Sequence, residues 1–80
     1  MKVTVKLFAT LRKYLPPDAT GGKAEVELPD GATVRQLVER LGIPQSAARL
    51  VMVDGEHCPE LDTPLQDGQT VSIFPPVAGG

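Results

Sequence analysis

The chain has 80 residues, which is enough for one domain with one small hydrophobic core and too few for a second core. Its formal net charge is −2 and its lysines and arginines are scattered, so the composition argues against a nucleic-acid surface and favours proteins as partners. The chain has no long apolar stretch, which argues against a membrane span, so we expect a cytoplasmic protein. Its single cysteine cannot form an internal disulfide, and no His or Cys lies at metal-ligand spacing from it, so we expect no metal site.

Two strands and a short helix are expected in the first third of the chain. Residues 2–8 alternate between apolar and polar side chains with the period of a half-buried strand. Residues 9–15 then have helical spacing of leucines until Pro16 and Pro17 prevent continuation. A second alternating segment, residues 23–28, predicts the next strand.

The strongest helix signal covers residues 33–41. Thr33 can cap the N-terminus, and Gln36 is placed to return the hydrogen bond in a capping box. Gly42 supplies a left-handed stop at the other end. The apolar stripe at i, i+3, i+4 and i+7 is formed by Val34, Leu37, Val38 and Leu41. We therefore expect one helix that packs on a sheet and holds the core together.

The second half of the chain predicts three short strands. Residues 50–53 form a compact apolar segment, and the turn pair at residues 54–55, Asp-Gly, favours a hairpin into residues 56–58. A further Asp-Gly turn at residues 67–68 precedes the last alternating segment, residues 70–74. This order of elements can cover only one face of a sheet with helix. The prediction is an α+β roll of the β-grasp, ubiquitin-like kind, with a mixed sheet over residues 1–74.

The last six residues form a candidate functional tail, which we expect to be flexible. They are Pro75, Pro76, Val77, Ala78, Gly79 and Gly80. The prolines favour an extended start, and the two glycines lack the Cβ atoms that would obstruct a narrow channel. Six extended residues reach at most about 20 Å, far enough to place the Gly80 carboxylate in a partner's pocket. The alternative is a frayed, glycine-rich terminus without function.

Two phenylalanines are predicted to form a docking patch beside the root of this tail. Phe8 shares a strand face with Thr4 and Lys6, and Phe74 shares one with polar residues of the last strand. If the first and last strands pair, the two rings lie near each other and expose an apolar surface suited to protein docking. The alternative is that a bulge or a strand end turns one ring inward.

Cys58 and the scattered basic residues have less specific roles. A reactive cysteine needs an activating neighbourhood, and His57 beside it would point to the opposite face of a strand. Cys58 is therefore expected to be a small apolar residue of the surface or core, or a member of the partner-facing patch. We expect solvated side chains, some of which could form rim contacts with an acidic partner, at Arg12, Lys13, Arg35, Arg40 and Arg49.

Three segments carry a resemblance to a known family. Residues 5–12, VKLFATLR, residues 64–71, PLQDGQTV, and residues 74–80, FPPVAGG, are similar to the sulfur-carrier small subunits of molybdopterin synthase, within the ubiquitin-like molybdopterin/thiamine sulfur-carrier family. The resemblance covers the whole chain. The terminal Gly-Gly is shared with thiamine and tRNA-thiolation carriers and with ubiquitin-like modifiers, which usually lack the Phe-Pro-Pro. The chain departs from the family at Asp54, where asparagine is common, and at residues 14–17.

The resemblance implies a mechanism in which this chain is a cosubstrate and binds no cofactor itself. A ubiquitin-activating-like enzyme would use ATP and Mg²⁺ to adenylate the Gly80 carboxylate, and a sulfur donor would convert the product to a thiocarboxylate. The large subunit, in a heterotetrameric synthase, would take in the tail and pass sulfur to cyclic pyranopterin monophosphate, forming the molybdopterin dithiolene. The catalytic groups are then expected on the partners.

Other functions remain open at the level of the sequence. The chain could carry sulfur for thiamine or tRNA thiolation, or be a protein modifier joined through Gly80 to lysines of its targets. A plain β-grasp interaction domain is the third possibility, and tail truncation would matter little to it.

Overall fold

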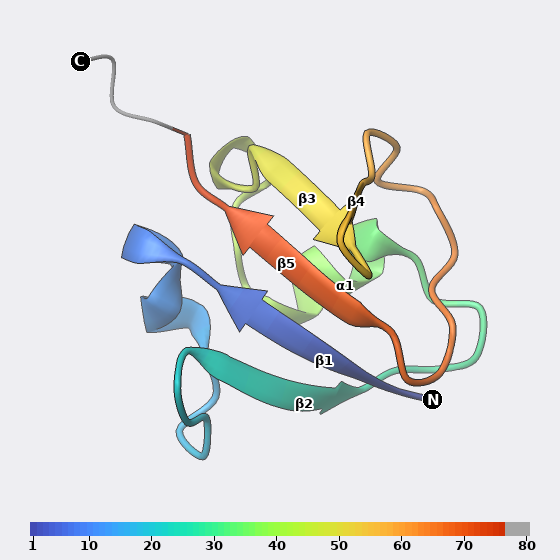
Figure 1. The fold of residues 1–80 in the computed structure, drawn as a ribbon, viewed down its shortest axis with the longest axis horizontal. Helices are drawn as coiled ribbons and strands as arrows, with labels where there is room; N and C mark the ends of the chain where they lie inside the picture. Colours follow the sequence, from blue (N-terminus) through green and yellow to red (C-terminus); the bar gives the residue numbers. More distant parts are fainter. Residues whose placement is uncertain (77–80) are drawn as a thin grey trace.

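A five-stranded mixed sheet forms the body of the protein, in the order β2-β1-β5-β3-β4 (Figure 1). The structure is a computed structural model that describes residues 1–76. Its strands are β1 (Lys2–Leu7), β2 (Lys23–Glu27), β3 (Leu50–Val53), β4 (Glu56–His57) and β5 (Thr70–Phe74). The central strands β1 and β5 are parallel, and the other neighbours are antiparallel. The predicted β-grasp arrangement is confirmed, with every predicted strand present.

One helix, α1 (Val34–Leu41), packs behind the sheet in the view of Figure 1. The predicted capping box is present: Thr33 Oγ1 accepts from the Gln36 N–H at 3.3 Å, and Gln36 Oε1 accepts from the Thr33 N–H at 2.8 Å. Gly42 ends the helix with φ of 78°, in the left-handed conformation that glycine adopts without strain. Both helix ends were therefore predictable from local sequence.

Two short 3₁₀ helices occupy connections, η1 (Ala9–Tyr14) and η2 (Gln45–Ala47). The helix predicted at residues 9–15 is thus present as a tighter 3₁₀ element. It ends at Tyr14, and the next residue, Leu15, is extended, with φ of −68° and ψ of 146°, because the following proline disfavours the helical region. η1 brings Leu11 into the core, where it is buried.

The hydrophobic core lies between α1 and the inner face of the sheet. Alternate residues of the strands point toward the helix because side chains in a strand alternate between faces. The inward-facing residues of the sheet and helix that are most deeply buried are Val3, Val5, Leu7, Val51, Val71, Ile73, Val34, Leu37 and Val38. Within residues 1–76, no helix covers the outer face of the sheet (Figure 1), so strand side chains of the opposite parity are open to solvent on that face.

The start of α1 is fastened to the loop that precedes β5. The Arg35 N–H donates to the Leu61 carbonyl at 2.7 Å and the Val34 N–H to the Thr63 carbonyl at 3.2 Å, which satisfies donors that a helix start leaves unpaired. Arg35 also pairs with Asp62 at 2.8 Å. The hydrogen bond from Arg35, and then its charge, lower the pKa of Asp62. This contribution to stability is present above the usual aspartate pKa and is lost as the pH falls through the lowered value.

The turn between β3 and β4 depends on Asp54. Asp54 and Gly55 have φ of 51° and 83°, the double left-handed conformation of a tight hairpin turn. The Asp54 carboxylate accepts from the Thr70 N–H at 2.9 Å, and the Asp54 N–H donates to the Thr70 carbonyl at 2.8 Å. This one residue therefore shapes the hairpin and fixes the start of β5.

We expect Asp54→Ala to lower the free energy of unfolding by about 1–3 kcal/mol. The substitution removes the acceptor of the Thr70 N–H and leaves a Cβ residue in the left-handed region without a local hydrogen bond. Asp54→Asn is the control, because asparagine tolerates the same φ and keeps an acceptor oxygen. Urea denaturation of both variants measures the difference. An equal loss in the two variants would contradict this account of the turn.

Candidate functional site

Phe8 and Phe74 lie side by side on the outer face of the sheet. Leu7 pairs with Ile73 in the parallel β1–β5 ladder, so the next residues along both strands are neighbours. Their rings are stacked, with centroids 4.3 Å apart and planes 9° apart. Both side chains are half-buried, and neither belongs to the core. The predicted neighbourhood is confirmed, and the alternative of an inward-turned ring is excluded.

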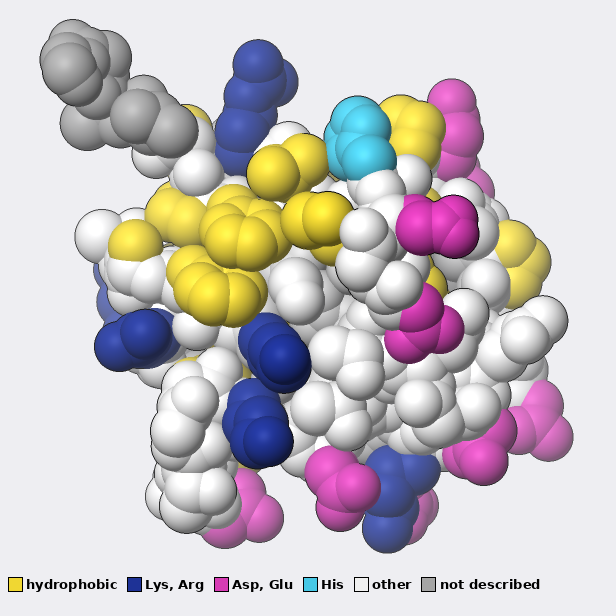
Figure 2. Space-filling model, in the orientation of Figure 1, with side chains coloured by type: hydrophobic (Ala, Val, Ile, Leu, Met, Phe, Trp, Pro, Cys, Tyr) yellow, Lys and Arg dark blue, Asp and Glu magenta, His cyan; other side chains and the backbone are white. Residues whose placement is uncertain are grey.

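The stacked rings form part of an open apolar groove of about 610 Å³. Its lining consists of Phe8, Ala9, Arg49, Leu50, Phe74, Pro75 and Pro76. Leu50 is Phe74's register partner in the antiparallel β3–β5 ladder and is 38% exposed. Figure 2 shows hydrophobic side chains gathered on this side of the molecule. We call the surface formed by Phe8, Leu50, Phe74, Pro75 and Pro76 the tail-root patch.

Leu50 is the member of the tail-root patch that the sequence analysis missed. The segment at residues 50–53 is apolar throughout, so it has no alternation from which a face could be assigned. The neighbouring residue Val51 is buried, which implies that Leu50 faces outward. The burial of Val51 follows from its pairing with Ile73 in β5, which the sequence does not show. The tertiary register, not local periodicity, places Leu50 outside.

The change in chain direction after Phe8 occurs at the next residue, Ala9. Ala9 has φ of 52°, a left-handed value that is uncommon for a residue with a Cβ atom. The strand accordingly ends at Leu7, one residue before the predicted end, and η1 begins. The chain leaves the sheet at this point while Phe8 stays against Phe74.

Cys58 lies apart from the tail-root patch, which corrects its predicted place in a partner-facing patch. It follows β4, its N–H donates to the Val51 carbonyl at 2.8 Å, and its side chain is 9% exposed within the core cluster. The thiol donates to the Glu60 carbonyl, with a sulfur–oxygen distance of 3.4 Å. His57 pairs with Met52 in the ladder and is exposed. Cys58 therefore has the position of a small core residue, the other expectation for it.

The candidate tail is described only at its beginning. Pro75 is half-buried and Pro76 is exposed, and both line the groove. The predicted threading residues Val77, Ala78 and Gly79, and the predicted sulfur bearer Gly80, lie outside the described residues. Their roles stay predictions, as does the domain boundary at residue 74.

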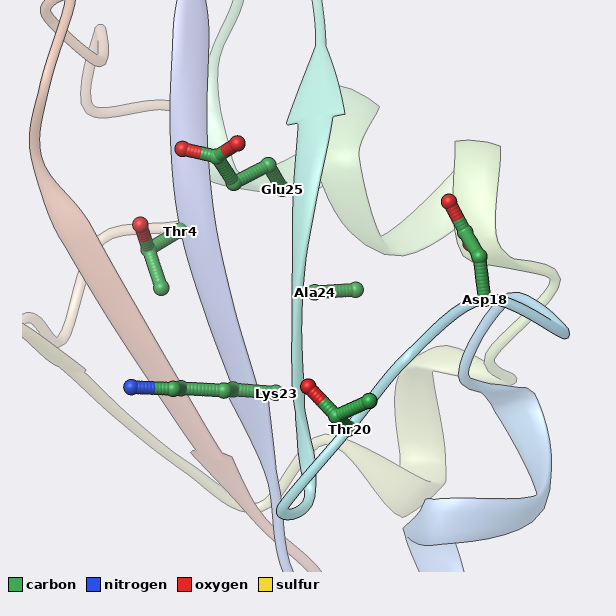
Figure 3. Close-up of a pocket in the computed structure, with 6 residues that line it drawn as sticks. All are labelled: Thr4, Asp18, Thr20, Lys23, Ala24 and Glu25. Carbon is green, nitrogen blue, oxygen red and sulfur yellow. The ribbon is translucent and has the colours of Figure 1, made fainter.

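A second, more polar hollow of about 360 Å³ lies along the edge strand β2. It is lined by Thr4, Asp18, Thr20, Lys23, Ala24 and Glu25 (Figure 3). Lys23 and Glu25 extend to one side of β2 and Ala24 to the other (Figure 3), as expected for alternation along a strand. Charged side chains on an edge strand discourage pairing with another chain. We assign this hollow no ligand.

Residues 1–76 carry no arrangement typical of a metal site or of a membrane span. Within residues 1–76, no group of three or more His, Cys, Asp or Glu side chains is arranged to hold a metal ion. No helix in this part is long and apolar enough to span a membrane. What this part of the chain does have, at the point where the tail leaves the sheet, is an open apolar groove.

Comparisons with known proteins agree with this geometry. The sequence model of the ThiS family matches residues 5–80, whereas no curated protein sequence matches the chain. A putative molybdopterin converting factor, subunit 1, from Pyrococcus furiosus has 33% identity and a TM-score of 0.70, over 95% of this chain and 98% of that one.

Two further solved structures share the fold at lower identity. Small archaeal modifier protein 1 from Haloferax volcanii has 24% identity and a TM-score of 0.70, over 95% of this chain and 98% of that one. Subunits 1 and 2 of molybdopterin-converting factor from Helicobacter pylori were solved as a complex. A chain of that complex matches with 23% identity and a TM-score of 0.61, over 100% of this chain and 100% of that one. These two likenesses bear on the fold alone.

Proposed function

The chain belongs to the ThiS family of ubiquitin-like sulfur carriers, and from this membership we propose that it is the sulfur-carrying small subunit of a molybdopterin synthase. The observation that carries the proposal is the stacked pair Phe8 and Phe74 beside the start of the tail. Identity of 33% to a putative subunit 1 of molybdopterin converting factor supports this role over that of a thiamine or tRNA-thiolation carrier.

The proposed chemistry takes place at the carbonyl carbon of Gly80. A partner enzyme with bound ATP and Mg²⁺ joins AMP to the carboxylate and releases pyrophosphate, because a free carboxylate is a poor electrophile. A sulfur donor then displaces AMP and leaves a thiocarboxylate. In the synthase, this sulfur attacks a carbon of cyclic pyranopterin monophosphate and displaces an oxygen there, and water then hydrolyses the acyl link, which leaves the sulfur on the pterin and returns the Gly80 carboxylate. The dithiolene holds two sulfur atoms, so two thiocarboxylated chains are consumed for each molybdopterin. We place these steps in the cytoplasm, with the catalytic groups on the partner proteins.

The tail-root patch gives this chemistry a physical basis. Docking of an apolar surface holds the body of the chain against its partner, and the attached six-residue segment is long enough to reach about 20 Å into a pocket. The binding free energy comes from the patch, so the terminal residues need no large side chains. The same surface can serve the activating enzyme and the large subunit in turn, since each needs the tail in a pocket next to the patch.

The test is sulfur transfer in a reconstituted system. Chain isolated as the Gly80 thiocarboxylate is mixed with the large subunit and cyclic pyranopterin monophosphate, and molybdopterin formed per thiocarboxylate is measured. Formation of molybdopterin is the expected result. A thiocarboxylate that transfers no sulfur to the pterin, but supports thiazole synthesis or tRNA thiolation, would reassign the pathway. Isopeptide-linked ladders on other proteins would indicate a modifier.

We expect Cys58→Ser to retain the sulfur yield of the parent in this assay. The substitution removes the only thiol of the chain, and the buried position of Cys58 keeps it away from the tail-root patch. Serine can keep the donation to the Glu60 carbonyl, although a polar group in the core lowers stability by about 1–3 kcal/mol.

Cys58→Ala is the matched control for folding, because it removes the thiol without adding a polar group. The yield is measured at saturating large subunit, and folding is checked by thermal denaturation. A sulfur yield near zero from folded, fully bound variants would mean that the thiol carries the sulfur. The mechanism at Gly80 would then be abandoned.

A further inference from the structure

Positive charge borders the tail-root patch, although the whole chain has a net charge of −2. Arg49 lines the groove, and its N–H donates to the Phe74 carbonyl at 3.0 Å. Lys6 lies two residues before Phe8 and therefore shares the outer face of the sheet with it. Lys23 is the residue of β2 that lies opposite Lys6. Dark-blue Lys and Arg side chains adjoin the hydrophobic group in Figure 2. Of the ten Asp and Glu side chains, none lines the groove.

These three cations have no carboxylate partner among the described residues. Two ion pairs with an N···O distance within 4.0 Å occur in residues 1–76. One joins Arg35 to Asp62, and the other joins the amino group of Met1 to Asp30. Glu25 is two residues from Lys23 but lies opposite Thr4, and it forms no such pair. Lys6, Lys23 and Arg49 are all exposed. Their charges are therefore available to another molecule.

The placement of Lys6 opposite Lys23 is unfavourable in the isolated chain. Like charges directly across two antiparallel strands destabilise a sheet, and the two residues share the outer face. The core does not require them, since both are exposed. Charges that cost stability in the free protein can still contribute when a partner supplies opposite charges.

We infer that Lys6, Lys23 and Arg49 form a positive rim that recognises Asp and Glu side chains around an apolar pocket on the large subunit. This inference rests on the proposed function, because it specifies the surface of that partner. Hydrophobic contact at the tail-root patch supplies affinity, while charge complementarity at its border speeds encounter and orients the docked chain. Correct orientation matters because the tail leaves from one end of the patch, at Pro75.

The experiment measures association with purified large subunit at two salt concentrations. Lys6→Glu, Lys23→Glu and Arg49→Glu are each expected to lower the association rate constant by about 3- to 10-fold at low salt. The differences should shrink to about 2-fold or less near 1 M salt, where the screening length falls to about 3 Å. Arg40→Glu is the matched control, since it makes the same charge change on α1, behind the sheet, and should keep the parent rate.

Thermal denaturation of the free chain gives a second readout. Lys23→Glu replaces a like-charge cross-strand pair by an opposite-charge pair, so its midpoint should rise by about 2–6 °C while its association slows. A merely structural role for Lys23 would not give this combination. Unchanged or faster association in all three variants, with a parent that binds the large subunit, overturns the positive rim and leaves the proposed function standing. A parent that does not bind the large subunit overturns the proposed function and this inference together.

Discussion

Deleting Gly80, or adding residues after it, is expected to abolish adenylation of the chain while leaving the fold intact. Adenylation requires the terminal carboxyl group at one position in the partner's pocket, and misplacement by about 1 Å can already cost about 100-fold in rate. A deletion withdraws the carboxyl group by one residue, and an extension moves it past the reactive position. The fold should survive because the core residues nearest the tail are Val71 and Ile73, within β5.

Intact-mass measurement after incubation with the activating enzyme, ATP, Mg²⁺ and the sulfur donor checks this result. A chain extended by a protease-cleavable segment is the matched control, because cleavage that restores Gly80 as the last residue should restore the thiocarboxylate. Thermal midpoints of the parent, deleted and extended chains should agree. Normal thiocarboxylate formation on an extended chain that has not been trimmed would sink the mechanism.

The second large effect is expected for Phe74→Ala, which should weaken binding to the large subunit by about 10- to 150-fold. This range follows from the roughly 1.5–3 kcal/mol gained by burying a phenylalanine side chain. The ring lines the groove on the outer face, so its loss removes contact area from the partner. Loss of the stack with Phe8 lowers the stability of the free chain by only about 0.5–1.5 kcal/mol.

Ile73→Ala is the control for this prediction, because Ile73 is the preceding residue of the same strand and is fully buried on the inner face. It should lose about 2–5 kcal/mol of stability, whereas its folded fraction should bind normally. Isothermal titration calorimetry gives the affinities, and denaturation gives the stabilities. If Phe74→Ala instead collapses the stability and its surviving folded protein binds normally, Phe74 belongs to the core and the docking role is wrong.

The sequence by itself determined the features that depend on residues close together in the chain. The capping box of Thr33 and Gln36, the helix stop at Gly42 and the turn at Asp54 all involve neighbours within a few positions, so their signatures could be read directly. Alternation in β1, β2 and β5 likewise identified strands and their faces. The order of these elements was enough to predict the β-grasp fold, whereas the sulfur-carrier family was implied by the resemblance of residues 5–12, 64–71 and 74–80.

Only the tertiary structure decided how distant segments meet on the outer face. The parallel β1–β5 register brings the ring centroids of Phe8 and Phe74 to 4.3 Å from each other. The two residues are 66 positions apart in the sequence, so no local pattern indicates that distance. Register also turned Leu50 outward and set Lys6 opposite Lys23. A shift of one residue in strand pairing would move each of these side chains to the other face, so their positions depend on packing of the whole sheet.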